Sequence, residues 1–60
     1  MPVVIVEMWE GRTQEQKKQL VEGITEAFVK IGTAGDRVAI ILKDNAKSNW
    51  AQGGKMASEL

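Results

Sequence analysis

The sequence predicts an α/β fold in which two strands flank a single helix, in the order β-α-β. Two runs of mostly branched apolar residues, 3–6 and 38–42, have the composition of buried strands. Between them, apolar residues recur at helical spacing over residues 20–31. The chain of 60 residues has room for one domain, so we expect a single unit spanning 1–60.

The first strand opens with Pro2, which is followed by the run VVIV. An uninterrupted apolar run is typical of a strand that is covered on both faces. Residues 7–9 extend the strand, and Gly11 ends it. Proline has no backbone N–H, which an edge strand tolerates at its first residue. A second interpretation is that Met1 is removed and leaves Pro2 with a free secondary amine.

A helix is predicted to begin after Thr13, which forms a capping box of the Thr-x-x-Gln type with Gln16. Its apolar stripe comprises Leu20, Val21, Ile24, Ala27, Phe28 and Ile31. Charged residues occupy the opposite side, as in a helix that packs against a sheet. Gly32 follows the stripe and is well suited to end the helix.

The second strand, 38–42, follows the helix and is expected to lie parallel to the first, with a right-handed crossover. The remaining segment, DNAKSNWAQGGKMASEL, combines turn-forming residues with Trp50 and a pair of glycines. It predicts a loop and a short hairpin or strand that Trp50 anchors. Two strands alone make a poor sheet, whereas pairing with a second copy gives a four-stranded sheet with helices on one face.

Composition narrows the possible functions. The chain has no Cys and no His, so it has no disulfides and lacks the commonest transition-metal ligands. Of the usual ways to stabilise so small a domain, oligomerisation remains. Eight basic and eight acidic residues give zero net charge without a basic patch, which argues against nucleic acid as a partner. No apolar run approaches the ~20 residues of a membrane span, and no signal peptide is recognisable. We therefore expect a cytoplasmic homo-oligomer whose chemistry uses carboxylates, Lys, Arg or the chain terminus.

Three parts of the chain together resemble the 4-oxalocrotonate tautomerase family: Pro2, the segment WEGRTQEQKKQLVEGITEA and the tail AKSNWAQGGKMAS. The resemblance spans nearly the whole chain. It implies a tautomerase-like β-α-β protomer, a dimer with a four-stranded sheet, and a hexamer built as a trimer of dimers. It also implies keto–enol tautomerisation of small unsaturated 2-hydroxy acids such as 2-hydroxymuconate, without a metal or cofactor.

By this resemblance Pro2 is the expected catalytic residue, a general base and acid after removal of Met1. An α-amino group titrates near pH ~8, and burial beside apolar groups or a nearby cation lowers its pKa further. A base that titrates near neutral pH is well matched to proton transfer. If Met1 stays attached, the nitrogen of Pro2 is an amide and cannot act as a base.

The resemblance makes Arg12 the group that binds a substrate carboxylate, to which its guanidinium fork is well matched. The alternative is a solvated loop residue at the positive end of the helix dipole, where a cation is mildly unfavourable. Trp50 stands where the family has an aromatic residue. It either walls the pocket against water or packs at a subunit interface. We interpret Trp9 as strand and core packing; the alternative is that it lines the site.

At one position the chain departs from the family pattern. Ala39 stands where the best-known members carry a second catalytic Arg, which polarises the substrate's carbonyl and grips its carboxylate. Arg37 lies two residues earlier, on the same face if the strand extends that far, and is a candidate substitute that binds substrate. The alternative for Arg37 is a surface residue at the strand edge.

Two other functions stay open at this point. A hydratase resembling haloacrylate dehalogenases needs a carboxylate to activate water, and Glu7 and Asp44 are the acidic residues nearest the strand ends. The other alternative is a non-catalytic oligomeric scaffold or ligand-binding protein, which retention of Met1 favours.

Overall fold

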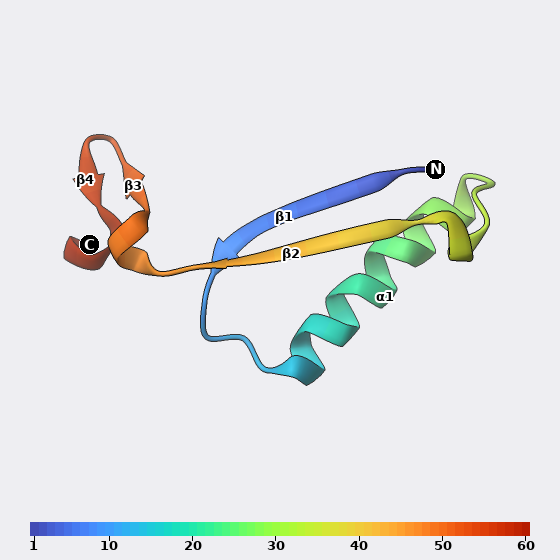
Figure 1. The fold of residues 1–60 in the computed structure, drawn as a ribbon, viewed down its shortest axis with the longest axis horizontal. Helices are drawn as coiled ribbons and strands as arrows, with labels where there is room; N and C mark the ends of the chain where they lie inside the picture. The colour runs from blue at the N-terminus through green and yellow to red at the C-terminus, as the bar shows by residue number, and fades with distance from the viewer.

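The computed structural model describes the whole chain, residues 1–60, and has the predicted β-α-β order (Figure 1). Strand β1 (Val3–Trp9) leads through a loop to helix α1 (Gln14–Lys30), and strand β2 (Ala39–Asn45) returns beside β1. The two strands are parallel and pair residue by residue over their whole length. The predicted fold class is confirmed for the single chain.

Both ends of α1 are closed by the hydrogen bonds that the sequence predicts. At its start, the N–H of Gln16 donates to Thr13 Oγ1 (3.1 Å) and the N–H of Thr13 donates to Gln16 Oε1 (2.9 Å). After its last turn, Gly32 has a positive φ of 99°, and the N–H of Thr33 donates to the carbonyl of Phe28 (3.1 Å). This Schellman arrangement explains why the helix stops before Gly32.

The second strand differs from the prediction at both of its ends. It begins at Ala39, one residue late, where the N–H of Ala39 donates to the carbonyl of Pro2 (3.0 Å). It continues through the polar residues 43–45 because each has a partner outside its own strand. Asp44, for example, forms an ion pair with Lys17 of α1.

The two faces of the strand pair differ in what covers them. The even-numbered residues of β1 point toward α1, and the last of them, Met8, is 8% exposed. The opposite side, which we call the outer face, is formed by Val3, Ile5, Ala39 and Ile41. Val3 and Ile5 are both 55% exposed. The prediction of strands covered on both faces is therefore met on one face only within a single chain.

Beyond β2 the chain forms a small arm at the end of the sheet where both strands finish (Figure 1). A 3-10 turn (Lys47–Asn49) leads to an antiparallel hairpin of β3 (Ala51–Gln52) and β4 (Lys55–Met56). Its turn residues Gly53 and Gly54 have positive φ values of 60° and 81°, as a two-residue turn of type I′ requires. The predicted hairpin is confirmed. The chain has no helix with the length and apolar character needed to cross a bilayer.

Candidate active site

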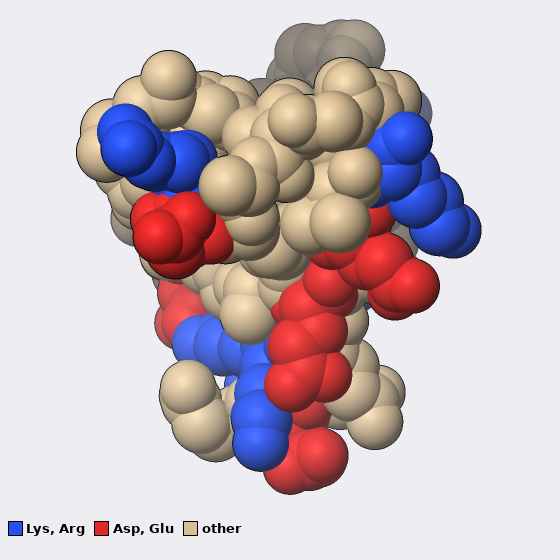
Figure 2. Space-filling model, turned by 90° about the vertical axis from the view of Figure 1, so that its right-hand side faces the viewer, with Lys and Arg blue, Asp and Glu red and all other residues tan.

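Pro2 lies immediately before β1, at the end of the sheet where both parallel strands begin. Its carbonyl accepts the first hydrogen bond of the strand ladder from Ala39, and the residue is half-buried. Figure 2 views the molecule from this end, where charged side chains of both signs surround a broad uncharged area. The sheet thus holds Pro2 at a defined place.

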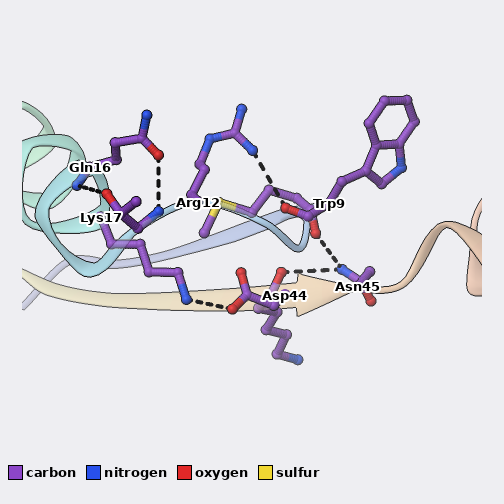
Figure 3. Close-up of polar contacts among 9 residues, drawn as sticks. Trp9, Arg12, Gln16, Lys17, Asp44 and Asn45 are labelled. Atoms are coloured by element: carbon purple, nitrogen blue, oxygen red, sulfur yellow. Dashed lines mark hydrogen bonds and ion pairs between the residues drawn. The ribbon is translucent and has the colours of Figure 1, made fainter.

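Arg12 lies in the loop between β1 and α1, beyond the far end of β1 from Pro2. Its Nη1 donates one long hydrogen bond, 3.5 Å, to the carbonyl of Trp9 (Figure 3). No carboxylate lies within ion-pair distance of the guanidinium; the two ion pairs of the chain join Lys17 to Asp44 and Lys43 to Glu7. An exposed guanidinium without a carboxylate partner is available to bind an anion.

Two tryptophans stand beside Arg12. The rings of Trp9 and Trp50 meet edge to face, with centroids 5.8 Å apart and planes inclined at 74°. Together with Met8, Arg12 and Gln52 they line a hollow of about 320 Å³. Arg12 is the one charged residue among these five, so the hollow combines mostly apolar walls with a single cation. Such a lining suits a carboxylate attached to an apolar carbon chain.

The structure does not bring all the predicted site residues together within one chain. Pro2 precedes β1 and Arg12 follows it, so the seven residues of the strand, ~3.3 Å each, separate them. Trp50 lies at the Arg12 end, on the arm that carries the C-terminus in Figure 1. One chain therefore holds the predicted site residues in two groups: Pro2 at one end of the sheet, and Arg12 with Trp50 at the other.

Arg37 lies at the Pro2 end, but not on the strand. It is the last residue of a 3-10 turn (Gly35–Arg37), in which its N–H donates to the carbonyl of Ala34 (3.0 Å). Because β2 begins only at Ala39, the condition for placing Arg37 on the same strand face is not met. Its side chain is exposed and has no ion-pair partner.

Trp9 does more than pack the strand, which was the alternative considered for this residue. Its ring lines the hollow, and Lys47 Nζ lies 4.8 Å from the ring centroid. Its indole Nε1 is buried without a hydrogen-bond partner. The signal in the sequence was its position as the last residue of the strand, three places before Arg12. Lys47 gave no comparable signal, because its contact joins segments far apart in the chain.

The acidic residues considered for a hydratase are already engaged. Asp44 is paired with Lys17, and Glu7 accepts a hydrogen bond from Asn45 Nδ2 (3.0 Å) and lies 4.0 Å from Lys43 Nζ. Neither carboxylate lines the hollow. No three His, Cys, Asp or Glu side chains gather as possible metal ligands.

Comparison with known proteins agrees with this fold over the whole chain. The family model described as "Tautomerase enzyme" matches residues 2–60. A 2-hydroxymuconate tautomerase of Bacillus subtilis (strain 168) is 39% identical over 61 aligned positions, which cover 100% of this chain and 98% of that protein. The crystal structure of YwhB, a homologue of 4-oxalocrotonate tautomerase, has a TM-score of 0.92 at 38% identity and covers 98% of each chain.

A further solved structure is a heterohexamer 4-oxalocrotonate tautomerase from Chloroflexus aurantiacus J-10-fl. It has a TM-score of 0.91 at 28% identity, covering 100% of this chain and 98% of that one. Sequence and backbone therefore lead to the same group of proteins. The chain belongs to the tautomerase family and is an enzyme of the 4-oxalocrotonate tautomerase type.

Proposed function

We propose that this enzyme catalyses keto–enol tautomerisation of a small unsaturated 2-hydroxy acid such as 2-hydroxymuconate. The family and the name of the Bacillus subtilis relative support this class of substrate. The observation that carries the proposal is the hollow in which Arg12 is the single charged residue beside two tryptophan rings. A carboxylate bound to Arg12 places the unsaturated chain against Trp9 and Trp50, which exclude water from it.

In this proposal Pro2 is general base and general acid once Met1 has been removed. The neutral secondary amine takes the proton of the substrate's 2-hydroxyl group, and the electron pair of that O–H bond forms the carbonyl. The electrons displaced from the enol double bond take a proton at carbon from the prolinium. One proton leaves oxygen and one arrives at carbon, so the reaction balances without a co-reactant.

We place each site between two copies of the chain. Pro2 and Arg12 are separated by the length of β1, so a single chain cannot present both to one small substrate. β1 has a free edge, since β2 is its one neighbour in the sheet. Antiparallel pairing of two free β1 edges sets the start of each strand beside the end of the other. Pro2 of one copy then approaches the Arg12 hollow of its partner.

This pairing belongs to a larger assembly, which we propose to be a cytoplasmic hexamer built as a trimer of dimers. The exposed outer face supplies the apolar surface for such an assembly. The Chloroflexus aurantiacus relative is a heterohexamer, which supports an assembly of six subunits. Arg37 lies at the Pro2 end and would reach the shared site from that side, where it is our candidate for the substrate-binding cation that polarises the carbonyl.

The test begins with the untagged native protein. We expect an intact mass lower than that of the full translation by one methionine, and ketonisation of 2-hydroxymuconate that falls by about 10²–10⁴-fold in Pro2→Ala. A retained Met1, or full activity in Pro2→Ala, would overturn the role of Pro2 and favour a binding or structural protein.

A mixing experiment then tests the shared site. Pro2→Ala and Arg12→Ala are each expected to be inactive alone, because each lacks one half of every site. After joint unfolding and refolding at equal amounts, about one quarter of the sites combine an intact Pro2 with an intact Arg12, so about one quarter of wild-type activity returns. A site contained in one chain predicts no recovery, which separates the two arrangements.

A further inference from the structure

The 3-10 turn before the hairpin joins Lys47 to Trp50 and sets both against Trp9. The N–H of Trp50 donates to the carbonyl of Lys47 (3.2 Å) and closes the turn. The ring of Trp50 meets the ring of Trp9 at 5.8 Å, and the ammonium of Lys47 lies 4.8 Å from the centroid of the Trp9 ring. The arm therefore places the ammonium of Lys47 over the ring of Trp9, which lines the Arg12 hollow.

Trp9 is in contact with two cations and no anion. Arg12 contacts its backbone carbonyl, and Lys47 lies over its ring. Neither cation has a carboxylate within ion-pair distance, and no acidic residue lines the hollow. Both cations contact Trp9, so an anion that binds at the hollow meets positive charge that no carboxylate of the chain neutralises.

The ammonium of Lys47 is free to exchange its present contact for a better one. Lys47 is exposed and has no hydrogen-bond acceptor, so the ring of Trp9 is its one specific contact. A cation–π contact at an exposed site is weaker than a charge-assisted hydrogen bond to a carboxylate. A carboxylate at the edge of the hollow therefore draws the ammonium from the ring, while a neutral group leaves it there.

We propose that Lys47 is a second anion-binding residue of the site and selects substrates that carry two carboxylates. This inference rests on the proposed function in that it uses the same hollow: Arg12 binds one carboxylate and Lys47 binds the other. The length of the carbon chain between the two carboxylates is then matched to the distance from Arg12 to the ammonium across Trp9.

The test compares a dicarboxylate with a monocarboxylate of the same chain length. Adipate and hexanoate serve as unreactive probes, and their binding is followed by the intrinsic fluorescence of Trp9 and Trp50, the two tryptophans of the chain. We expect Lys47→Met to weaken adipate binding about tenfold and hexanoate binding less than about twofold, since one charge-assisted hydrogen bond is lost. Methionine keeps an unbranched apolar stem over the Trp9 ring.

Two further variants serve as controls. Lys47→Arg keeps the charge and is expected to restore the preference for adipate. Lys18→Met removes one exposed lysine from α1, outside the hollow, and is expected to leave the binding of both probes unchanged. If Lys47→Met weakens both probes equally, Lys47 only holds Trp9 in place, and the proposal is wrong. It is equally wrong if neither probe is affected.

These titrations are independent of turnover. Adipate and hexanoate do not react, so the preference for two carboxylates is measured whether or not Pro2 is the base. If Pro2→Ala keeps full activity while Lys47→Met still weakens adipate binding, the proposed reaction is wrong and the proposed binding site stands. If Pro2→Ala loses activity while Lys47→Met leaves adipate binding unchanged, the reaction stands and Lys47 does not bind substrate.

Discussion

Among single residues, Asn45 links the two strands at the Arg12 end through its side chain. Its Nδ2 lies within hydrogen-bond distance of Glu7 Oε1 (3.0 Å) and of the carbonyls of Met8 and Lys43 (both 3.2 Å). Two amide hydrogens are thus shared among three acceptors on β1 and β2. The chain leaves β1 for the Arg12 loop directly beyond this point, so Asn45 supports the residues that line the hollow (Figure 3).

Asn45→Ala is expected to lower the free energy of unfolding by about 1–2 kcal/mol, because strand acceptors at this point lose their donor. Urea unfolding at one fixed chain concentration measures the change, since the stability of a chain that associates depends on its concentration. Asn49→Ala is the matched control: Asn49 is exposed, and its side chain makes no hydrogen bond. Equal effects of the two substitutions would show that the bonds of Asn45 contribute nothing specific.

Contacts between distant residues explain what the sequence did not reveal about the site. Pro2, Arg12 and Trp50 were predicted from the resemblance to the family at those positions, and their roles stay predictions. The meeting of Trp9 with Lys47 and Trp50 depends on how the arm folds back on the end of β1. No local pattern encodes that contact, so the cation over the Trp9 ring appears only in three dimensions.

Secondary-structure elements were the most predictable part of the molecule. The helix and its two ends follow from local bonds between near neighbours in sequence, such as the capping box of Thr13 and Gln16. The end of β2 was predicted too early because residues 43–45 look like a turn. Their strand conformation depends on partners that local patterns do not show, including Lys17 on α1 and Glu7 on β1.

The capping box offers a prediction at this scale. Thr13→Ala is expected to destabilise the protein by about 1 kcal/mol, because the N–H of Gln16 loses its acceptor at the start of α1. Thr13→Ser keeps the hydroxyl and should stay within a few tenths of a kcal/mol of the wild type. Thermal unfolding followed by far-ultraviolet circular dichroism compares the three proteins. A loss as large in the serine variant would mean that the methyl group of Thr13, not its hydroxyl, stabilises the helix.

The whole molecule is flat, and its shape bears on how it is stabilised. It measures 42 × 24 × 14 Å, and only Met8 and Ala57 are buried. A chain this short buries about 60% of its unfolded surface even when it is well packed. The outer face adds apolar area that a single chain leaves in water. Its fold class was predictable from the sequence, whereas the proposal of a shared site rests on the separation of Pro2 and Arg12 in the structure.

Ile5→Lys tests whether the outer face holds copies together. A charge at a face that is buried on association is costly, so we expect a smaller particle and loss of tautomerase activity. Ile5→Val is the matched control, since it keeps a branched apolar side chain in β1 and should retain both size and activity. Analytical ultracentrifugation measures the size. An unchanged particle in Ile5→Lys would exclude the outer face as an interface.

The exposed outer face also affects a newly made chain before it associates with a second copy. A newly made copy exposes an apolar strand pair with free edges, which is the kind of surface that chaperones bind and proteases reach. The proposed association hides this surface, so rapid synthesis would favour association and slow synthesis would favour degradation. The amount of working enzyme in a cell would then rise more steeply than its rate of synthesis.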